Sequence, residues 1–395
     1  MIVRQFLQWI RSAPPGDRAD ATSALARAYL LSDLSTDDRA AAEGAMIMLL
    51  DDPSPLVRQA LAEVFASAQN APPVIVGALA ADQPQVAVPI LSRSPLLLEA
   101  DLIDLVATGG PEVQTAIAGR PILPRSLAAA IAEVGSAEAC LALLENVDAD
   151  IAPFSIRRMV ERFGYLAPIR ENLFARDDLP MPTRQALLSK LSQTLAGFVS
   201  ARQWLGPEHA EHATREACEK ATVALAADTP YDELPELVQH LRESGQLTAG
   251  MILRGFLSGN VVLFEEALTE LSGMPLDRVT SYIHDRNLSG FHALYRKAGL
   301  PEGAYTAFRE AIAAMREGVL AGEQGNAARL KRRMVERVLE ECSAEPDADD
   351  SLLALLRRFA VEAAREEARM FCDDLVATSP AIMLDEPMIE TRLVA

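Results

Sequence analysis

Aromatic residues are scarce in this chain: they make up 5% of its 395 residues, while the hydrophobic fraction is 50%. The core must therefore be filled mainly by alanine and leucine, and small alanine side chains let helices approach closely. That composition favours all-α packing. The chain is also too long for one ordinary core, a limit that stacked repeats escape because each unit contacts only its neighbours.

Cysteines and long apolar runs are sparse as well. The cysteines lie far apart with no Cys-x-x-Cys pair, which argues against a disulfide framework and against a thiolate zinc site. No window approaches the ~18 continuous apolar residues of a membrane span. We therefore expect a protein of the reducing cytoplasm with no membrane span. The four cysteines are Cys140, Cys218, Cys342 and Cys372.

Positive charge is in deficit, with 37 lysines and arginines against 56 aspartates and glutamates and a formal net charge of -19. Surplus negative charge repels phosphate backbones, so nucleic acid is not an expected partner. The strongest basic run is followed by glutamates at helical offsets of three and four, which predicts neutralisation along one helix. That run consists of Arg329, Lys331, Arg332, Arg333 and Arg337.

Motifs for a reaction are also missing. The sequence has no G-x-x-x-x-G-K-[ST] phosphate loop, no G-x-G-x-x-G turn, no G-x-S-x-G elbow and no H-E-x-x-H helix. We accordingly predict no catalytic residue and no cofactor.

The chain does contain an internal repeat. The segments Asp51 to Leu61 and Asp177 to Leu187 share two acidic positions and an Arg-Gln-Ala-Leu sequence in the same relative places. Their offset of 126 residues is near four units of about 31, and Asp82-Gln-Pro84 falls near the first intermediate position. Helix pairs commonly repeat every ~30 to ~47 residues, so the spacing predicts a solenoid of stacked helix pairs.

Helices are predicted from apolar stripes at the helical period and from the breaks between them. Around the first copy, residues 39–50 form one expected helix, and a second begins at Pro55 with Ser54 as its N-cap. Short helices interrupted by proline and glycine continue from there. Long charged helices are predicted beyond Gly322.

This change in helix length divides the chain into three predicted parts. Residues 1–199 hold short helical repeats, and residues 200–320 form a second helical module that opens with a long helical stretch at 200–227. Residues 321–395 are a long-helix C-terminal element. Its apolar and acidic tail, residues 380–395, is a candidate to occupy a groove in the same or another molecule.

The Asp-Pro-Ser-Pro-Leu-Val-Arg unit that ends at Arg58 resembles HEAT repeats. In that family, an aspartate and an arginine at these positions help to form polar ladders between units. The resemblance implies that Asp52 and Arg58, and likewise Asp178 and Arg184, are inter-repeat struts. It also implies the fold, an all-α HEAT-like α-α superhelix, or solenoid, followed here by the C-terminal long-helix element.

A second resemblance covers most of the chain and is most specific between residues 247 and 312. It is carried by Gly-Met-Ile-Leu-Arg-Gly-Phe-Leu-Ser-Gly-Asn, ending at Asn260, and by Gly-Phe-His-Ala-Leu-Tyr-Arg-Lys-Ala-Gly-Leu-Pro, ending at Pro301. Both are similar to an uncharacterised bacterial family known as a domain of unknown function with HEAT-like N-terminal helices. This resemblance implies a fold and a cytoplasmic setting, and it supplies no catalytic residue.

Basic residues and histidines gather in the same segment, which is conspicuous in an acidic chain. Arginine offers bidentate donors and lysine a mobile charge, so the group suits a phosphate, a nucleotide messenger or an acidic peptide. The alternative is pairing with the nearby acids Asp285, Glu302 and Glu310 on a solvated face. The candidate ligand- or partner-binding residues are Arg286, His292, Arg296, Lys297 and Arg309.

Two histidines and a glutamate, His209, His212 and Glu216, share one helix face at offsets of three and four. They would present two imidazoles and a carboxylate to one metal ion, although a transition metal needs a further ligand and supporting contacts. Surface helices rich in glutamate and histidine show the same spacing. We therefore predict no metal centre and keep these three residues as weak candidates.

A curved solenoid without reaction motifs is suited to binding proteins along its surface. We expect a non-catalytic scaffold or regulatory adaptor that binds a protein or peptide. The alternative is a sensor of a small ligand or a phosphate-containing messenger, or an enzyme, that uses residues 284–309. Homo-oligomer formation stays open.

Overall fold

Helices form the regular structure of the chain. The computed structural model describes residues 6, 8–10, 12–285, 289–320, 327–345 and 349–378. Across these ranges, β pairing is limited to an isolated bridge between Leu123 and Ala149. The all-α prediction is confirmed. The chain divides into two compact units, Met1–Phe198 and Val199–Ala395, while the predicted three-part division stays a prediction.

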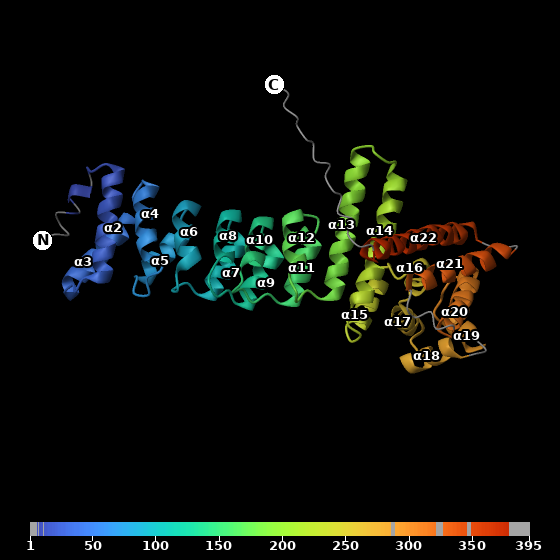
Figure 1. Cartoon of the computed structure of the whole chain (residues 1–395). Coiled ribbons are helices and arrows are strands. Elements are labelled where there is room, and N and C mark those ends of the chain that lie inside the picture. Colours follow the sequence, from blue (N-terminus) through green and yellow to red (C-terminus); the bar gives the residue numbers. More distant parts are fainter. Residues whose placement is uncertain are drawn as a thin grey trace, which may run out of the picture. The chain divides into compact units, whose positions relative to one another are not determined.

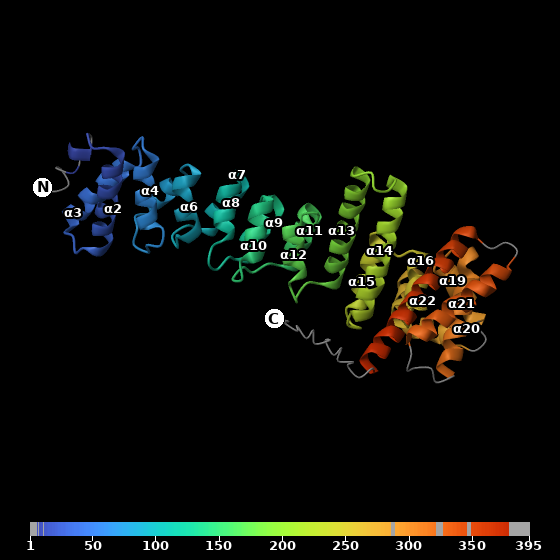
Figure 2. The same ribbon diagram turned by 45° about the horizontal axis from the view of Figure 1, so that its top comes forward.

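The helices of the first unit stack in two layers, as Figure 1 and Figure 2 show. The second layer contains α7 (Glu99–Thr108), α9 (Arg125–Val134) and α11 (Pro153–Phe163). Two further helices, α3 (Thr36–Leu49) and α5 (Pro73–Ala80), pack against the first layer. The first layer consists of α2 (Pro15–Leu31), α4 (Pro55–Phe65), α6 (Pro84–Arg93), α8 (Pro111–Ala118), α10 (Ala137–Glu145) and α12 (Ala167–Phe174). Helix α13 (Met181–Ala201) follows the pair α11 and α12 in the chain.

Proline begins several of these helices. Its ring holds φ near the helical value, and its missing N–H would have no partner in the first turn of a helix. Pro55, Pro84 and Pro111 begin α4, α6 and α8 in this way. Ser54 precedes α4 as predicted, but its side chain makes no capping bond; its backbone N–H instead donates to Oδ1 of Asp52 at 2.8 Å.

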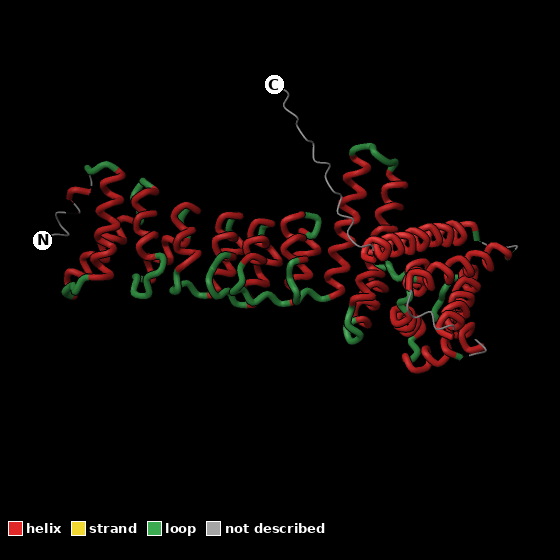
Figure 3. The backbone as a smooth tube through the Cα atoms, in the orientation of Figure 1, coloured by secondary structure: helices red, strands yellow, loops and turns green. Residues whose placement is uncertain are grey.

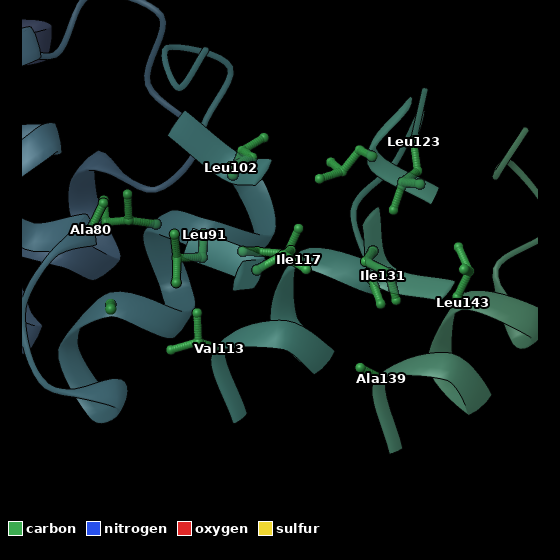
Figure 4. Close-up of a cluster of buried hydrophobic side chains, with 14 of the residues drawn as sticks. Ala80, Leu91, Leu102, Val113, Ile117, Leu123, Ile131, Ala139 and Leu143 are labelled. Atoms are coloured by element: carbon green, nitrogen blue, oxygen red, sulfur yellow. The ribbon is translucent and has the colours of Figure 1, made fainter. Parts of the chain in front are cut away.

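Apolar side chains fill the space between the layers (Figure 4). Leu91 of α6, Ile117 of α8, Ile131 of α9 and Leu143 of α10 follow one another along the stack and are fully buried. Full burial of one such side chain contributes about 1.5–3 kcal/mol. The helices from α4 to α12 have only 8 to 11 residues and would be marginal alone, so this shared core keeps them folded.

The repeat is shorter than the sequence comparison suggested. Successive first-layer helices from α4 to α12 begin at intervals of roughly 30 residues or slightly fewer. Four steps along this layer lead from α4 to α12, whereas the second copy of the sequence signature lies at the start of α13. The two copies therefore occupy different positions in the stack, and the offset of 126 residues is not a whole number of repeats.

Arginine–aspartate contacts join successive first-layer helices. Arg18 of α2 donates to both carboxylate oxygens of Asp52, just before α4, at 3.0 and 2.7 Å. Arg58 of α4 donates to both carboxylate oxygens of Asp82, just before α6, at 2.5 and 3.0 Å, and also to the carbonyl of Asp52. Burial opposes ionisation of Asp82, but hydrogen bonds from Arg58 and the Gln83 N–H outweigh it and lower the pKa of Asp82.

At the second copy, the same residue types stay within one connection. Asp178 pairs with Arg176, two residues earlier, at 2.7 Å. Arg184 donates to the carbonyls of Arg176 and Leu179 at 2.8 and 3.2 Å. These contacts fix the turn between α12 and α13 rather than joining two repeats.

Other polar side chains reach back to the preceding repeat. Arg162 of α11 donates to the carbonyls of Ala132 and Gly135, at the end of α9, at 2.7 and 2.8 Å. Arg120, after α8, donates to two carbonyls at the end of α6. The last carbonyls of a helix have no partner within it, so these arginines satisfy acceptors that packing would otherwise leave unpaired.

The second unit is arranged around α16 (Ala249–Leu257). Gly255 of this helix permits close packing, because a Cβ atom there would lie 2.8 Å from Cδ2 of Leu263 on α17. The neighbours of α16 are α14 (Pro207–Asp228), α17 (Val261–Ser272), α20 (Tyr305–Leu320), α21 (Ala327–Ala344) and α22 (Asp350–Thr378). The other elements are α15 (Leu234–Glu243), α18 (Leu276–His284), α19 (Ser289–Lys297) and a 3-10 turn at Glu302–Ala304.

Aromatic rings concentrate in the core of this unit. Phe264 stacks on Phe256 and Phe308, with ring centroids 4.4 and 5.7 Å apart. Phe291 and Tyr295 of α19 complete the cluster, and all five side chains are buried. These rings come from the segment that resembles the bacterial family, so packing accounts for much of its pattern.

The long C-terminal helices α21 and α22 pack against each other, as the predicted long-helix element requires. The expected continuous helix at 200–227 is interrupted, because α13 ends at Ala201 and Pro207 begins α14. The proposed tail at 380–395 lies outside the described residues. Within the part of the chain that the structure describes, no helix is long and apolar enough to cross a membrane.

We predict that the substitution Arg58→Gln loosens the contact between α4 and α6. Losing hydrogen bonds to a charged group costs about 1.5–3 kcal/mol. Native-state hydrogen exchange of the α4 and α6 amides at pH 7 would report the loss as faster local opening. The folded-state pKa of Asp82 is lowered. The contribution of Asp82 to the free energy of unfolding is therefore present above its unfolded-state pKa and is lost as the pH falls through its folded-state pKa. The difference from the parent protein should therefore shrink in acid.

The matched control is Arg93→Gln. Arg93 forms an exposed pair with Glu63 at 2.7 Å, and exposed pairs contribute about 0–1 kcal/mol. Equal acceleration of amide exchange in the two variants would contradict a structural role for the arginine–aspartate contacts between first-layer helices.

Candidate functional site

One glutamate partly neutralises the predicted basic cluster. His292 and Arg296 of α19 both face Glu302, with N–O separations of 3.8 and 3.4 Å. The His292 ring also lies edge-on to Tyr305, with centroids 4.7 Å apart. Because all three charged side chains are about half exposed or more, the pairs contribute only about 0–1 kcal/mol each.

Two other predicted members form no ion pair with Glu302 in the described part of the chain. Arg309 of α20 donates to Glu310 at 3.0 Å. Lys297 is exposed at the end of α19 and has no ion pair among the described residues. Arg286 lies outside the described residues. The described members of the predicted set therefore do not share one acidic partner.

Arginines occupy the polar face of α14 that supplied the weak metal candidates. Glu216 accepts from Nη2 of Arg254 at 3.1 Å and lies 3.6 Å from Nε of Arg358. His212 contacts the Arg358 guanidinium through Nε2, and His209 is exposed near the start of the helix. Over the described ranges, no group of three or more His, Cys, Asp or Glu side chains is arranged to hold a metal ion.

Arg254 carries a buried charge at the centre of the second unit. Its side chain projects from α16, is 4% exposed, and pairs with Glu216 of α14 at 3.1 Å and with Glu362 of α22 at 2.8 Å. Its guanidinium carbon lies 4.2 Å from the ring centroid of Phe359. An unpaired buried charge costs several kcal/mol, so a buried arginine requires such partners. Arg254 therefore ties α14, α16 and α22 together.

A pocket of about 730 Å³ opens beside Arg254. It lies between α14, the turn from α16 to α17, α21 and α22. Sites for small ligands commonly enclose about 300–1,000 Å³. No aromatic side chain among the described residues lines this pocket, so the described lining provides no surface for stacking a flat ring.

Cations outnumber acids in the lining of this pocket. Lys331 pairs with Glu366 at 2.6 Å, and Arg254 pairs with Glu362. The remaining three cations have no ionic partner within the described part of the chain. They are Lys220 of α14 and Arg365 and Arg369 of α22. This site is not recognisable in the sequence, because its members are spread from residue 220 to residue 369.

An exposed apolar side chain recurs at successive connections of the first unit. Val74, Leu98, Ile122 and Val147, called the apolar row, lie where the chain passes from the first layer to the second, and Figure 3 shows these connections along one edge. Their exposed fractions run from 67% to 94%. They recur at intervals of roughly 25 residues, close to one repeat. The apolar row was not predicted from the sequence.

Ile122 is held in an unusual conformation. Its φ of 57° places a β-branched residue in the left-handed region, which costs on the order of 1–3 kcal/mol. The next residue is fixed by a bridge to the following connection, where the Asp150 N–H donates to the carbonyl of Leu123 at 3.0 Å. The packing of two repeats thus keeps an apolar side chain exposed, and such strain concentrates at functional sites.

All four cysteines are free. Burial raises the pKa of the Cys140 and Cys342 thiols to about 11. Both groups therefore stay protonated near neutral pH and lack the thiolate needed for nucleophilic attack or metal binding.

Residues 86–346 match the model of a protein family described as an uncharacterised protein conserved in bacteria, DUF2336. The chain belongs to the DUF2336 family. Comparison with curated proteins and with solved structures gives no match. The predicted relation to an uncharacterised bacterial family is confirmed, and the HEAT-like character of the repeats stays a prediction.

The DUF2336 match includes parts of both candidate surfaces. Three members of the apolar row lie inside it, and Val74 precedes it. The pocket cations on α14, α16 and α21 also lie inside it, whereas Arg365 and Arg369 of α22 follow it. The wall of the pocket that α22 supplies therefore lies outside the DUF2336 segment of this chain.

We predict that Arg254→Met destabilises the second unit by about 1.5–3 kcal/mol, because two part-buried carboxylates lose hydrogen bonds to a charged group. Methionine keeps most of the apolar volume, so charge is the main property changed. Hydrogen exchange of α14, α16 and α22 during mild urea treatment would measure the loss. Arg357→Gln is the matched control because Arg357 is exposed on α22 and lies outside the pocket. Similar protection in the two variants would show that the buried network contributes little.

Proposed function

We propose that this DUF2336 protein is a cytoplasmic scaffold or regulatory adaptor that binds a partner protein along the apolar row. The observation that carries the proposal is the row itself, with four exposed aliphatic side chains at corresponding points of successive repeats. Exposed apolar residues scattered singly are ordinary, whereas contiguous apolar surface on a protein marks an interaction site.

The spacing of the row favours an extended partner segment. Helices stacked in one layer are about 8–10 Å apart, so neighbouring row members are expected at similar steps. A polyproline II segment has three residues per turn and rises about 3.1 Å per residue, so every third side chain returns to one face after about 9 Å. A partner with an apolar residue at every third position would then place one side chain on each repeat.

The conformation of Ile122 supports the same proposal. A loop normally loses backbone freedom when a partner covers it, and this loss weakens binding. The backbone around Ile122 is already restrained by the bridge between Leu123 and Ala149. Part of the ordering cost is therefore met in the free protein.

We predict that a photoreactive amino acid at position 122 captures a partner in the native host, whereas the same amino acid at position 56 does not. Leu56 is the matched control, because it is an aliphatic residue of the first unit that is 56% exposed in the first turn of α4, where the chain enters the first layer rather than leaving it. Mass spectrometry of the cross-linked product would identify the partner and the attached residue. Equal capture at both positions, or adducts only between two copies of this chain, would contradict the proposal.

The double variant Leu98→Ser with Val147→Ser extends the test to affinity. Each aliphatic side chain that a partner buries contributes about 1.5–3 kcal/mol, so loss of two is expected to weaken binding at least tenfold. Both side chains are exposed in the free protein, so the circular dichroism spectrum should be unchanged.

A further inference from the structure

The pocket of the second unit carries positive charge that the described fold does not neutralise. Lys220, Arg365 and Arg369 line it without an ionic partner among the described residues. Arg365 and Arg369 are one helical turn apart on α22, so their like charges oppose each other. The chain has a net charge of -19, so the positive charge of this lining is opposite in sign to the charge of the protein as a whole. A bound anion would remove this repulsion.

Two residues that line the pocket hold buried hydrogen-bond donors without acceptors. Nε of Arg254 is buried and has no hydrogen-bond partner, although the side chain is 4% exposed and lines the pocket. Nδ2 of Asn260 is buried and unpartnered as well. Its Oδ1 accepts from the Leu263 N–H at 3.0 Å, which holds the amide in place with its donor group free. Buried donors left unsatisfied cost about 1–3 kcal/mol each, and ligand oxygens would satisfy them.

The same wall contains the start of α17. Asn260 is the N-cap of this 12-residue helix, and the N-terminus of a helix carries partial positive charge. Gly259, just before it, has a φ of 89° and no atom within 4 Å of the position of a Cβ, so its backbone is open to an approaching group.

We propose that this pocket binds a small ligand that carries at least two phosphate groups. Each phosphate carries a charge of about -1.5 to -2 near neutral pH, so two of them balance the three unpaired cations. Arginine forks bind phosphate oxygens in pairs, and lysine adds a flexible point charge. Because the lining residues that the structure describes include no aromatic ring, recognition falls on the phosphates rather than on a base. This site is independent of the apolar row.

Calorimetric titration of the full chain with inorganic pyrophosphate at about 0.15 M salt tests the proposal. We expect saturable binding that is tighter than binding of inorganic phosphate. The double variant Arg365→Gln with Arg369→Gln should weaken it at least tenfold, because each hydrogen bond to a charged group contributes about 1.5–3 kcal/mol. Arg357→Gln on the same helix should leave the affinity unchanged, since Arg357 does not line the pocket.

A second variant predicts a gain. Glu366→Gln releases Lys331 from its pair and removes one acid from the lining, so pyrophosphate should bind more tightly. Glu367→Gln is its control, because Glu367 pairs with Arg332 outside the pocket. Absence of binding by the parent chain, equal affinity for phosphate and pyrophosphate, equal loss in the Arg357→Gln variant, or no difference between the two glutamate variants would overturn the proposal.

Discussion

The short length of its helices is the constraint on which the first unit depends. Helices of 8 to 11 residues cannot recover the cost of nucleation alone, so each must bury an apolar face against both neighbours in its layer. Regular stacking then returns the chain to the same edge once per repeat. Polar groups left at the ends of these helices are satisfied by side chains such as Arg58 and Arg162 from adjoining repeats. Packing does not explain why an aliphatic side chain is exposed at each of four successive connections. Such exceptions to the general pattern of burial are expected at functional surfaces.

The second unit depends on a different interaction, the buried charge of Arg254. The aromatic cluster packs α16 against α17, α19 and α20, while Arg254 attaches α14 and α22 through carboxylates. Because Glu362 is committed to Arg254, it does not neutralise Arg365 one turn further along α22. Burial also raises the pKa of Glu219 on α14, and the nearby charge of Arg254 opposes that rise. The charge of the pocket is thus a consequence of how the core is held together.

Most of the fold was accessible from sequence because helix formation here is controlled locally. Proline at the first helical position and apolar stripes located the short helices, and the long charged helices predicted beyond Gly322 correspond to α21 and α22. The repeat phase was not accessible, because an acidic turn followed by Arg-Gln-Ala-Leu is a local helix start that serves α4 and α13 equally well. The partner of Asp52 could not be predicted from the sequence either. Arg18 lies 34 residues away, at a spacing that only the stacked structure sets.

The pocket shows why local charge density was a poor guide to the site. The segment from His292 to Arg309 attracted notice because its basic residues are close in sequence, yet Glu302 and Glu310 lie beside three of them. On α22, acids and bases alternate along one face, so the sequence reads as balanced. That balance disappears in the folded protein, because Arg254 and Lys331 from other helices pair with the glutamates of this face. The arginines of the same face are left without an ionic partner among the described residues. A binding surface for anions can therefore arise from an apparently neutral helix, provided that tertiary contacts neutralise one sign of its charge and not the other.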